Sequence, residues 1–186
     1  MKLAIVASLT MSALAASSTS HAAEWNAGLV TGVCGTGTER EYWQHTCWFN
    51  GLRADVLFGR ESARDFALGP TLDITTAGFD DVRFGSGASL LIPIHPIVPI
   101  IVSGGGYARK SELGWEPGIE SFTFVGSRSF NYHASYGIAA GLVLGFQYGL
   151  GDSRESAISI ALQLDGQILL LPFVAGYQLL RGPAYD

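Results

Sequence analysis

The stretch Cys47–Phe58, CWFNGLRADVLF, alternates between two unlike faces. One face carries Trp48, Asn50, Leu52, Ala54, Val56 and Phe58, and the other carries Phe49, Gly51, Arg53, Asp55 and Leu57. A period of two residues predicts a β-strand. If the apolar face points inward, the strand belongs to a soluble sandwich or barrel. If Arg53 and Asp55 point inward instead, the apolar face needs lipid as its solvent.

Segment 132–148, YHASYGIAAGLVLGFQY, favours the lipid-facing interpretation. Its even positions form an aliphatic band with aromatic residues at both ends, from Tyr132 to Tyr148. Its odd positions are small, and His133 and Ser135 lie near one end of this face. Aromatic residues that flank an apolar centre are typical of membrane β-barrels, where they lie at the two lipid–water interfaces.

The polar faces of the other strand-like segments support the same interpretation. They carry glycine, threonine and a few charges of both signs, and the whole chain contains only two lysines, Lys2 and Lys110. Small residues with a few pairable charges suit the narrow lumen of an eight-stranded barrel, and buried charges persist when they are paired and hydrogen-bonded. We predict a lumen polar network that comprises Arg53, Asp55, Asp73, Arg83, His133, Ser135 and Asp165.

Alternation recurs along the chain and predicts an all-β fold. The expected strands lie near residues 25–33, 47–58, 65–76, 81–93, 98–109, 132–148, 156–165 and 168–180. An even number of strands places both termini at one end of an eight-stranded antiparallel up-and-down transmembrane barrel. The long connections are expected at 34–46 and 110–131, and shorter ones at 59–64, 94–97 and 149–155. Pro70 and Pro172 lie inside expected strands, so a bulge or a strand end is expected at each.

The N-terminus has the pattern of an export signal. Lys2 precedes an apolar run, and a small-residue zone ends at Ala22. We therefore expect a signal peptide over residues 1–22 and a barrel domain over residues 23–186. Export to an oxidising compartment allows Cys34 and Cys47, the two cysteines of the chain, to form a disulfide that pins the connection between them.

Composition excludes several function classes. The chain has 186 residues and a formal net charge of −5, which suits a single domain and offers no basic stripe for nucleic acid. No motif indicates a nucleotide, another cofactor or a metal site. The exposed aromatic residues Tyr42, Trp43 and Trp115 of the two long connections are the candidates for binding a partner.

The predicted signal peptide, the alternating strands, the aromatic bands and the two-sided connections together resemble the small outer-membrane β-barrels of Gram-negative bacteria, the OmpA/OmpX class. The resemblance is architectural and covers nearly all of the chain after residue 22. It implies a monomer in the bacterial outer membrane, in contact with membrane lipid and lipopolysaccharide. Such proteins usually end on an aromatic residue, whereas this chain ends RGPAYD at Asp186.

The class includes enzymes, and one motif bears on this. His133 and Ser135 form HAS, whereas the outer-membrane lipid A 3-O-deacylases carry a His-x-Ser-Asn pattern with a later Glu. Tyr136 replaces the Asn, and Gln147 stands about where the Glu is expected. We therefore expect a non-enzymatic structural or surface-interaction barrel with its binding in connections 34–46 and 110–131. A lipid A deacylase-like hydrolase and a soluble periplasmic lipocalin-like carrier remain the alternatives.

Overall fold

A computed structural model describes residues 23–38, 41, 43–111, 114–130 and 137–168. Within these ranges the chain forms eight strands and a short helical turn at residues 166–168. The strands are β1 (Glu24–Thr38), β2 (His45–Leu57), β3 (Ala67–Ala77), β4 (Asp81–Ile92), β5 (Ile100–Ser111), β6 (Gly114–Arg128), β7 (Ala139–Gly149) and β8 (Glu155–Asp165). Within the described part, no helix is long and apolar enough to cross a membrane.

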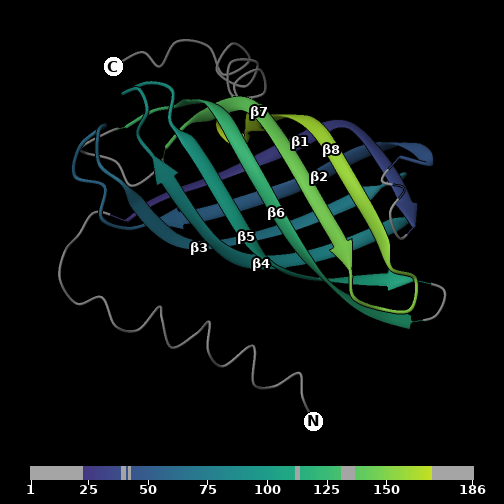
Figure 1. Ribbon diagram of the computed structural model, residues 1–186. Coiled ribbons are helices and arrows are strands. Elements are labelled where there is room, and N and C mark those ends of the chain that lie inside the picture. The colour runs from purple at the N-terminus through teal and green to yellow at the C-terminus, as the bar shows by residue number, and fades with distance from the viewer. Residues whose placement is uncertain (1–22, 39–40, 42, 112–113, 131–136, 169–186) are drawn as a thin grey trace, which may run out of the picture.

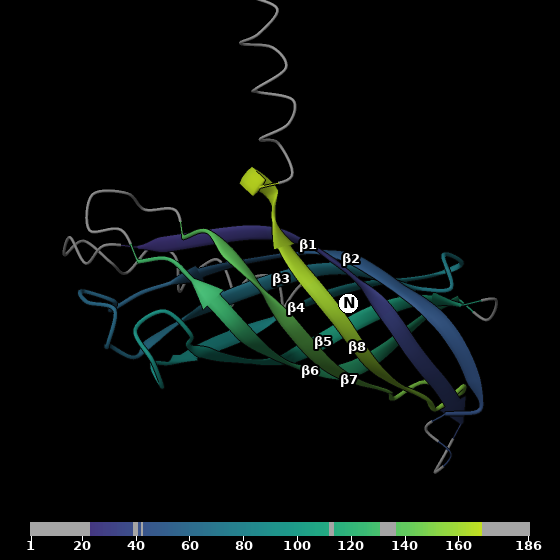
Figure 2. The same ribbon diagram turned by 90° about the horizontal axis from the view of Figure 1, so that it is seen from above.

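The strands form one closed antiparallel barrel (Figures 1 and 2). Each strand pairs with its neighbours in the sequence, and β8 closes the ring by pairing with β1 from Gly28↔Asp165 to Thr38↔Glu155. Consecutive antiparallel neighbours make this an up-and-down barrel. The predicted all-β, eight-stranded antiparallel barrel is therefore confirmed.

Two of the expected segments were wrong. Residues 110–131 do not form a long loop, because Gly114–Arg128 is β6 and pairs with β5 and β7 along its length. The segment 168–180 was expected to be the eighth strand, yet the ring is complete with β8 at Glu155–Asp165. Residue 168 belongs to the short helical turn, and residues 169–180 lie outside the described residues.

The predicted distribution of connection lengths is reversed. We call the end that holds Glu24 and Asp165 the termini end, and the end that holds Cys34 and Cys47 the disulfide end. At the disulfide end the connections are short, at residues 39–44, 78–80, 112–113 and 150–154. At the termini end they are longer, at residues 58–66, 93–99 and 129–138. The expected loop 34–46 shrinks because its flanks extend β1 and β2 to the pair Thr36↔His45.

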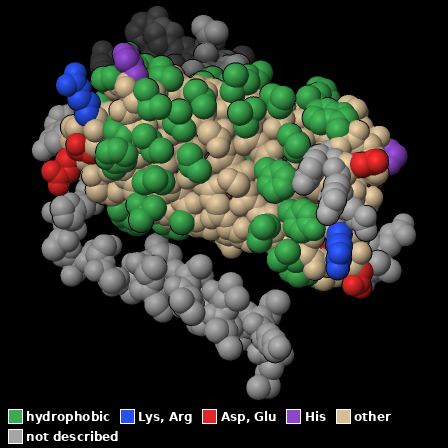
Figure 3. Space-filling model, in the orientation of Figure 1, with side chains coloured by type: hydrophobic (Ala, Val, Ile, Leu, Met, Phe, Trp, Pro, Cys, Tyr) green, Lys and Arg blue, Asp and Glu red, His purple; other side chains and the backbone are tan. Residues whose placement is uncertain are grey.

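The outer wall of the barrel is apolar. The outward side of β2 exposes Trp48 and Leu52, and that of β3 exposes Leu72. In Figure 3, hydrophobic side chains cover the visible wall, whereas Lys, Arg, Asp, Glu and His side chains gather at the two ends. On β7 the even positions, such as Leu142 and Leu144, face outward. The aliphatic band predicted from residues 132–148 therefore lies on the outside.

Pro70 lies within β3 without ending it. The β3–β4 ladder continues through Pro70↔Ala88, whereas the β2–β3 ladder runs from Phe49↔Ala77 to Asp55↔Thr71 and then stops. An isolated bridge, Phe58↔Leu68, resumes the same register beyond it. Because proline has no backbone N–H, the ladder is interrupted at this residue while the strand continues, without the predicted bulge.

Glycine allows neighbouring strands to approach closely where the barrel closes. Gly32 on β1 pairs with Ala161 on β8, and a Cβ at Gly32 would overlap the carbonyl oxygen of Ile160 and the Cα of Ala161. Gly106 on β5 differs, since a Cβ there would make only an ordinary contact, 3.5 Å from the carbonyl oxygen of Gly118. Both residues lie in regular strand conformation, so they form a matched pair.

Replacing Gly32 by alanine is expected to destabilise the barrel by about 1–3 kcal/mol, the usual cost of overpacking, because the overlap is with backbone atoms. The matched Gly106→Ala variant is expected to be neutral or slightly stabilising, since alanine loses less conformational freedom on folding. Urea unfolding of both variants in detergent micelles, followed by tryptophan fluorescence, measures the difference. Equal unfolding midpoints would contradict the close approach of β1 and β8.

Candidate functional site: the polar lumen

Most of the charged side chains of the lumen lie in three layers along the barrel, together with the polar side chains of Ser103 and Gln147. The inward positions of β2, β3, β4 and β7 are odd-numbered, and those of β1 and β6 are even-numbered. The central layer consists of Arg53, Asp73, Ser103, Glu120 and Gln147. The termini layer consists of Glu24, Asp55, Arg60 and Arg128. The disulfide-end layer consists of Asp81, Arg83, Arg109 and Glu155.

The central layer joins opposite walls of the barrel. Arg53 on β2 donates to Ser103 Oγ on β5 at 2.6 Å, and its guanidinium lies 4.5 Å from the ring centroid of Phe122 on β6. Gln147 on β7 donates from Nε2 to Glu120 Oε2 on β6 at 3.0 Å. β2 and β5 do not pair with one another, so the contact between Arg53 and Ser103 crosses the barrel interior. Gln147 and Glu120 are ladder partners on the adjacent strands β7 and β6.

Gly85 makes room for two carboxylates of this layer. A Cβ at Gly85 would overlap Glu120 Oε1 and approach both carboxylate oxygens of Asp73. Asp73 is also the ladder partner of Arg53. A barrel of this size has little interior space, so an inward glycine on β4 provides the volume that the longer side chains of β3 and β6 occupy.

The termini layer is built around Glu24. Its carboxylate accepts from Arg60 Nη1 and from Arg128 Nε, each at 2.6 Å. Arg128 also forms a bidentate pair with Asp55, at 2.7 and 3.0 Å. The side chain of Arg128 is only 1% exposed and that of Arg60 is fully buried. Charge-assisted bidentate pairs are among the stronger hydrogen bonds in proteins, so this layer ties β1, β2, β6 and the connection 58–66 together.

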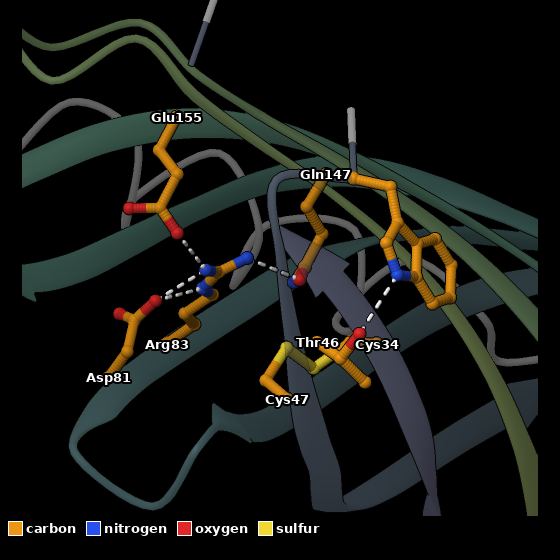
Figure 4. The surroundings of a disulfide bond; sticks show 8 residues. Cys34, Thr46, Cys47, Asp81, Arg83, Gln147 and Glu155 are labelled. Atoms are coloured by element: carbon orange, nitrogen blue, oxygen red, sulfur yellow. Dashed lines mark hydrogen bonds and ion pairs between the residues drawn. A yellow bond between two sulfur atoms is a disulfide. The ribbon is translucent and has the colours of Figure 1, made fainter. Parts of the chain in front are cut away.

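The disulfide-end layer is a ring of two arginines and two carboxylates. Arg83 on β4 and Arg109 on β5 are ladder partners, so their like charges lie side by side. Asp81 and Glu155 each contact both guanidinium groups. Figure 4 shows Asp81 and Glu155 directed toward Arg83 and shows Gln147 on the other side of the guanidinium. Arg83 donates to Gln147 Oε1 at 2.7 Å, which connects this ring to the central layer.

The structure places the predicted network residues as follows. Arg53, Asp73, Arg83 and Asp165 are buried on the inner side of the wall, and Asp55 is half-buried there. Asp165 accepts a hydrogen bond from Asn26 Nδ2 at 2.6 Å, at the termini end of the barrel. His133 and Ser135 lie outside the described residues, so their predicted place in the network stays a prediction.

Nine residues of the three layers were not part of the predicted lumen network. They are Glu24, Arg60, Asp81, Ser103, Arg109, Glu120, Arg128, Gln147 and Glu155. Glu24 precedes the first expected strand, Arg60 lies in an expected turn, and Glu120 and Arg128 lie in the expected loop 110–131. The alternation of β6, with inward Glu116, Gly118, Glu120, Phe122 and Phe124, was the signal that could have found two of them.

The disulfide Cys34–Cys47 is present, as predicted. The two residues are ladder partners on β1 and β2, so the bond lies within the wall beside the hairpin instead of across a long loop. Figure 4 shows it in the same part of the barrel as Arg83 and Gln147. Its covalent link therefore reinforces the first hairpin at the disulfide end.

Trp43 and Trp115, two of the three predicted aromatic binding residues, lie on opposite sides of the barrel. Trp43 donates from Nε1 to Thr46 Oγ1 at 3.0 Å, and its ring occupies the space that a Cβ on Gly35 would need. Trp115 belongs to β6 and packs against Phe84, with ring centroids 5.9 Å apart. β2 and β6 lie four strands apart in the ring of eight, which makes them opposite. Tyr42 lies outside the described residues.

The described part of the chain contains no group of three His, Cys, Asp or Glu side chains placed to hold a metal ion. Glu24, Asp55, Asp81 and Glu155 are instead paired with arginines. Glu120 and Asp165 accept hydrogen bonds from the side-chain amides of Gln147 and Asn26. Such contacts allow polar side chains to fill and cross-link a lumen.

No family model and no curated protein matches the chain. Two solved structures of a Yersinia pestis protein are similar to it, each with 9% sequence identity, a TM-score of 0.40 and coverage of 76% of this chain. One is the backbone structure of the outer membrane protein Ail in a phospholipid bilayer nanodisc, of which 99% is covered. The other is the crystal structure of Ail, the attachment invasion locus protein, in complex with the heparin analogue sucrose octasulfate, of which 97% is covered. At this TM-score the likeness carries no argument, and the barrel is established by its own strand pairing.

Replacing Arg128 by methionine leaves Glu24 and Asp55 without their shared partner and is expected to cost about 3–5 kcal/mol of unfolding free energy, as for other broken buried pairs. Arg64→Met is the matched control, because Arg64 is exposed at the same end and a surface substitution usually changes stability by less than about 0.5 kcal/mol. Urea unfolding of the two variants gives the comparison.

A second substitution separates lost charge from lost packing. Adding Asp55→Asn to Arg128→Met removes the carboxylate that has lost its only arginine partner among the described residues, whereas Glu24 keeps Arg60, and it is expected to restore part of the lost stability. If the double variant were no more stable than Arg128→Met, the ion pair between Arg128 and Asp55 would not be the cause.

Proposed function

We propose that this chain is a bacterial outer-membrane β-barrel with a structural or surface-interaction role and no enzymatic activity. The observation that carries the proposal is the inverted distribution of its residues, with apolar side chains on the outer wall and ionisable side chains inside. Soluble monomers rarely expose continuous apolar patches larger than a few hundred Å². A closed barrel satisfies all of its strand hydrogen bonds internally, which is the condition for crossing hydrocarbon.

Aromatic residues near both barrel ends support the membrane location. Trp48 and Trp115 are exposed near the disulfide end, and Trp25 and Phe66 are exposed near the termini end. Aliphatic residues such as Leu72 fill the wall between them. Tryptophan is enriched at the two membrane–water interfaces because its ring is apolar and its N–H is polar.

The filled lumen argues against a soluble carrier and against a wide pore. A lipocalin-like carrier needs an apolar interior to receive its ligand, whereas this interior buries Asp73 and Glu120 and holds Arg53 and Arg83 in contacts that cross it. An eight-stranded barrel is only wide enough to be filled by its own side chains. We therefore assign the barrel a role in the membrane itself or at its two ends.

The proposed orientation places the termini end in the periplasm. Residues 1–22 are assigned as the signal peptide that delivers residues 23–186 there. The hairpin tips at the disulfide end are short, so insertion from the periplasm carries few polar backbone groups through hydrocarbon. Any contact with lipopolysaccharide or a surface partner is then made by the tips at 39–44, 78–80, 112–113 and 150–154, and the chain acts as a monomer. The assignment of binding to a long loop at 110–131 is not kept, because β6 occupies it.

Fractionation of cells that express the chain tests the membrane proposal. We expect recovery in the outer-membrane fraction, extraction by detergent only, and faster gel migration of the unheated barrel. Recovery in the soluble periplasmic fraction would contradict it. Purified protein is also expected to release no fatty acid from lipopolysaccharide; release that Ser135→Ala abolishes would establish the hydrolase alternative instead.

Cysteine labelling of intact cells tests the orientation. Asp152→Cys places a thiol on an exposed tip at the disulfide end, and Arg64→Cys places one on an exposed connection at the termini end. The native cysteines are joined in a disulfide and do not react. We expect a membrane-impermeant maleimide to label only Asp152→Cys in intact cells and both variants after lysis. Labelling of Arg64→Cys alone in intact cells would reverse the orientation.

A further inference from the structure

The outer wall has an apolar groove across β1, β2, β3 and β4, with a volume of about 600 Å³. Its outward lining consists of Ala27, Leu29, Leu52, Ala54, Leu72, Ile74 and Phe84, together with Gly166. The ladder pairs Ala27↔Ala54 and Ala54↔Leu72 place these three residues in one row across the wall. The next row, Leu29↔Leu52, Leu52↔Ile74 and Ile74↔Phe84, is bulkier. The small alanine side chains of the first row leave a depression beside the second.

The chain leaves the barrel at one end of this groove. Gly166 follows the last residue of β8, and a Cβ on it would lie 3.3 Å from the carbonyl oxygen of Ala27, the first residue of the alanine row. In Figure 2 the short helical turn after β8, in yellow, stands next to β1. One end of the row Ala27, Ala54, Leu72 therefore lies beside residues 166–168, where the described part of the chain ends.

The sequence that follows is strongly apolar. Residues 168–180, ILLLPFVAGYQLL, contain one amide, Gln178, and no charge. The barrel offers this segment no free strand edge, because β8 already pairs with β1 and every strand has two neighbours. An apolar segment that cannot join the sheet still has to bury its side chains, which favours an apolar surface within reach.

We propose that residues 168–180 dock in the groove on the outer wall of β1–β4 and cover the row Ala27, Ala54, Leu72. The groove lies where the chain arrives, and both surfaces are apolar and uncharged. The segment then forms an intramolecular layer between this face of the barrel and the surrounding lipid. The opposite face, formed by β6 and β7, stays in direct contact with lipid.

Cross-linking in the full-length chain tests the docking. Leu72→Cys combined with Val174→Cys is expected to form an intramolecular disulfide on mild oxidation, since residue 72 lies in the groove. Leu142→Cys combined with Val174→Cys is the matched control, because Leu142 is similarly exposed but belongs to β7, four strands from β3. Cys34 and Cys47 are already joined and do not compete. Equal yields for the two pairs, or cross-links between copies only, would overturn the proposal.

Lipid quenching gives an independent measurement. A fluorophore on Leu72→Cys, in vesicles that contain brominated acyl chains, is expected to be quenched severalfold more strongly when the chain stops after Ile168. A fluorophore on Leu142→Cys is expected to be quenched equally in both lengths. Full quenching at residue 72 in the complete chain would show that lipid fills the groove and would overturn the docking. Absence of quenching at residue 142 would contradict the membrane proposal instead, and the cross-link yields would still decide the docking.

Discussion

The pairing of β1 with β8 is the contact on which the rest of the structure depends. Without it, the two edge strands would expose a row of unpaired N–H and C=O groups, which lipid cannot satisfy. Closing a ring of eight strands gives the barrel a small circumference. Its interior is therefore only wide enough to be filled by side chains. Glycines such as Gly32 permit the closure, and glycines such as Gly85 release volume for the carboxylates of neighbouring strands.

The charges inside the barrel follow from the same constraint. A polar side chain on the outer wall would face hydrocarbon, so the polar positions of each strand turn inward and meet those of the opposite wall. There they form three layers, and Gln147 links two of them because it contacts both Arg83 and Glu120. Each arginine faces at least one carboxylate or hydroxyl, which is what allows ionised groups to remain buried. The network stiffens the barrel across its diameter, because it links strands that no ladder of backbone hydrogen bonds connects.

The alternation of apolar and polar residues predicted the fold class. The prediction of individual strands failed where this alternation was hard to recognise. Segment 132–148 was decisive because its two faces differ in both size and polarity. β6 was missed because Pro117, Gly118 and Gly126 suggest a loop and because Glu116 and Glu120 suggest solvent. Their burial depends on partners from β7 and the 150–154 turn, Gln147 and Ser153, which no local pattern contains. Segment 168–180 was expected to complete the ring because it is apolar throughout, a pattern whose structure periodicity alone does not decide, whereas β8 at Glu155–Asp165 closes the ring. The layers of the lumen could be foreseen only as a list of charges, since the identity of each partner depends on which strands lie opposite.

The position of Glu24 has a consequence for the order of assembly. It is the first residue of β1, yet its carboxylate is held by Arg60 and by Arg128, the latter 104 residues further along the chain. Contacts of such large sequence separation form only after much loop-closure entropy has been lost. The contact between Glu24 and Arg128 therefore forms only when β6 is in place. The first side chain of β1 reaches its final contacts only once a distant part of the chain has joined the barrel.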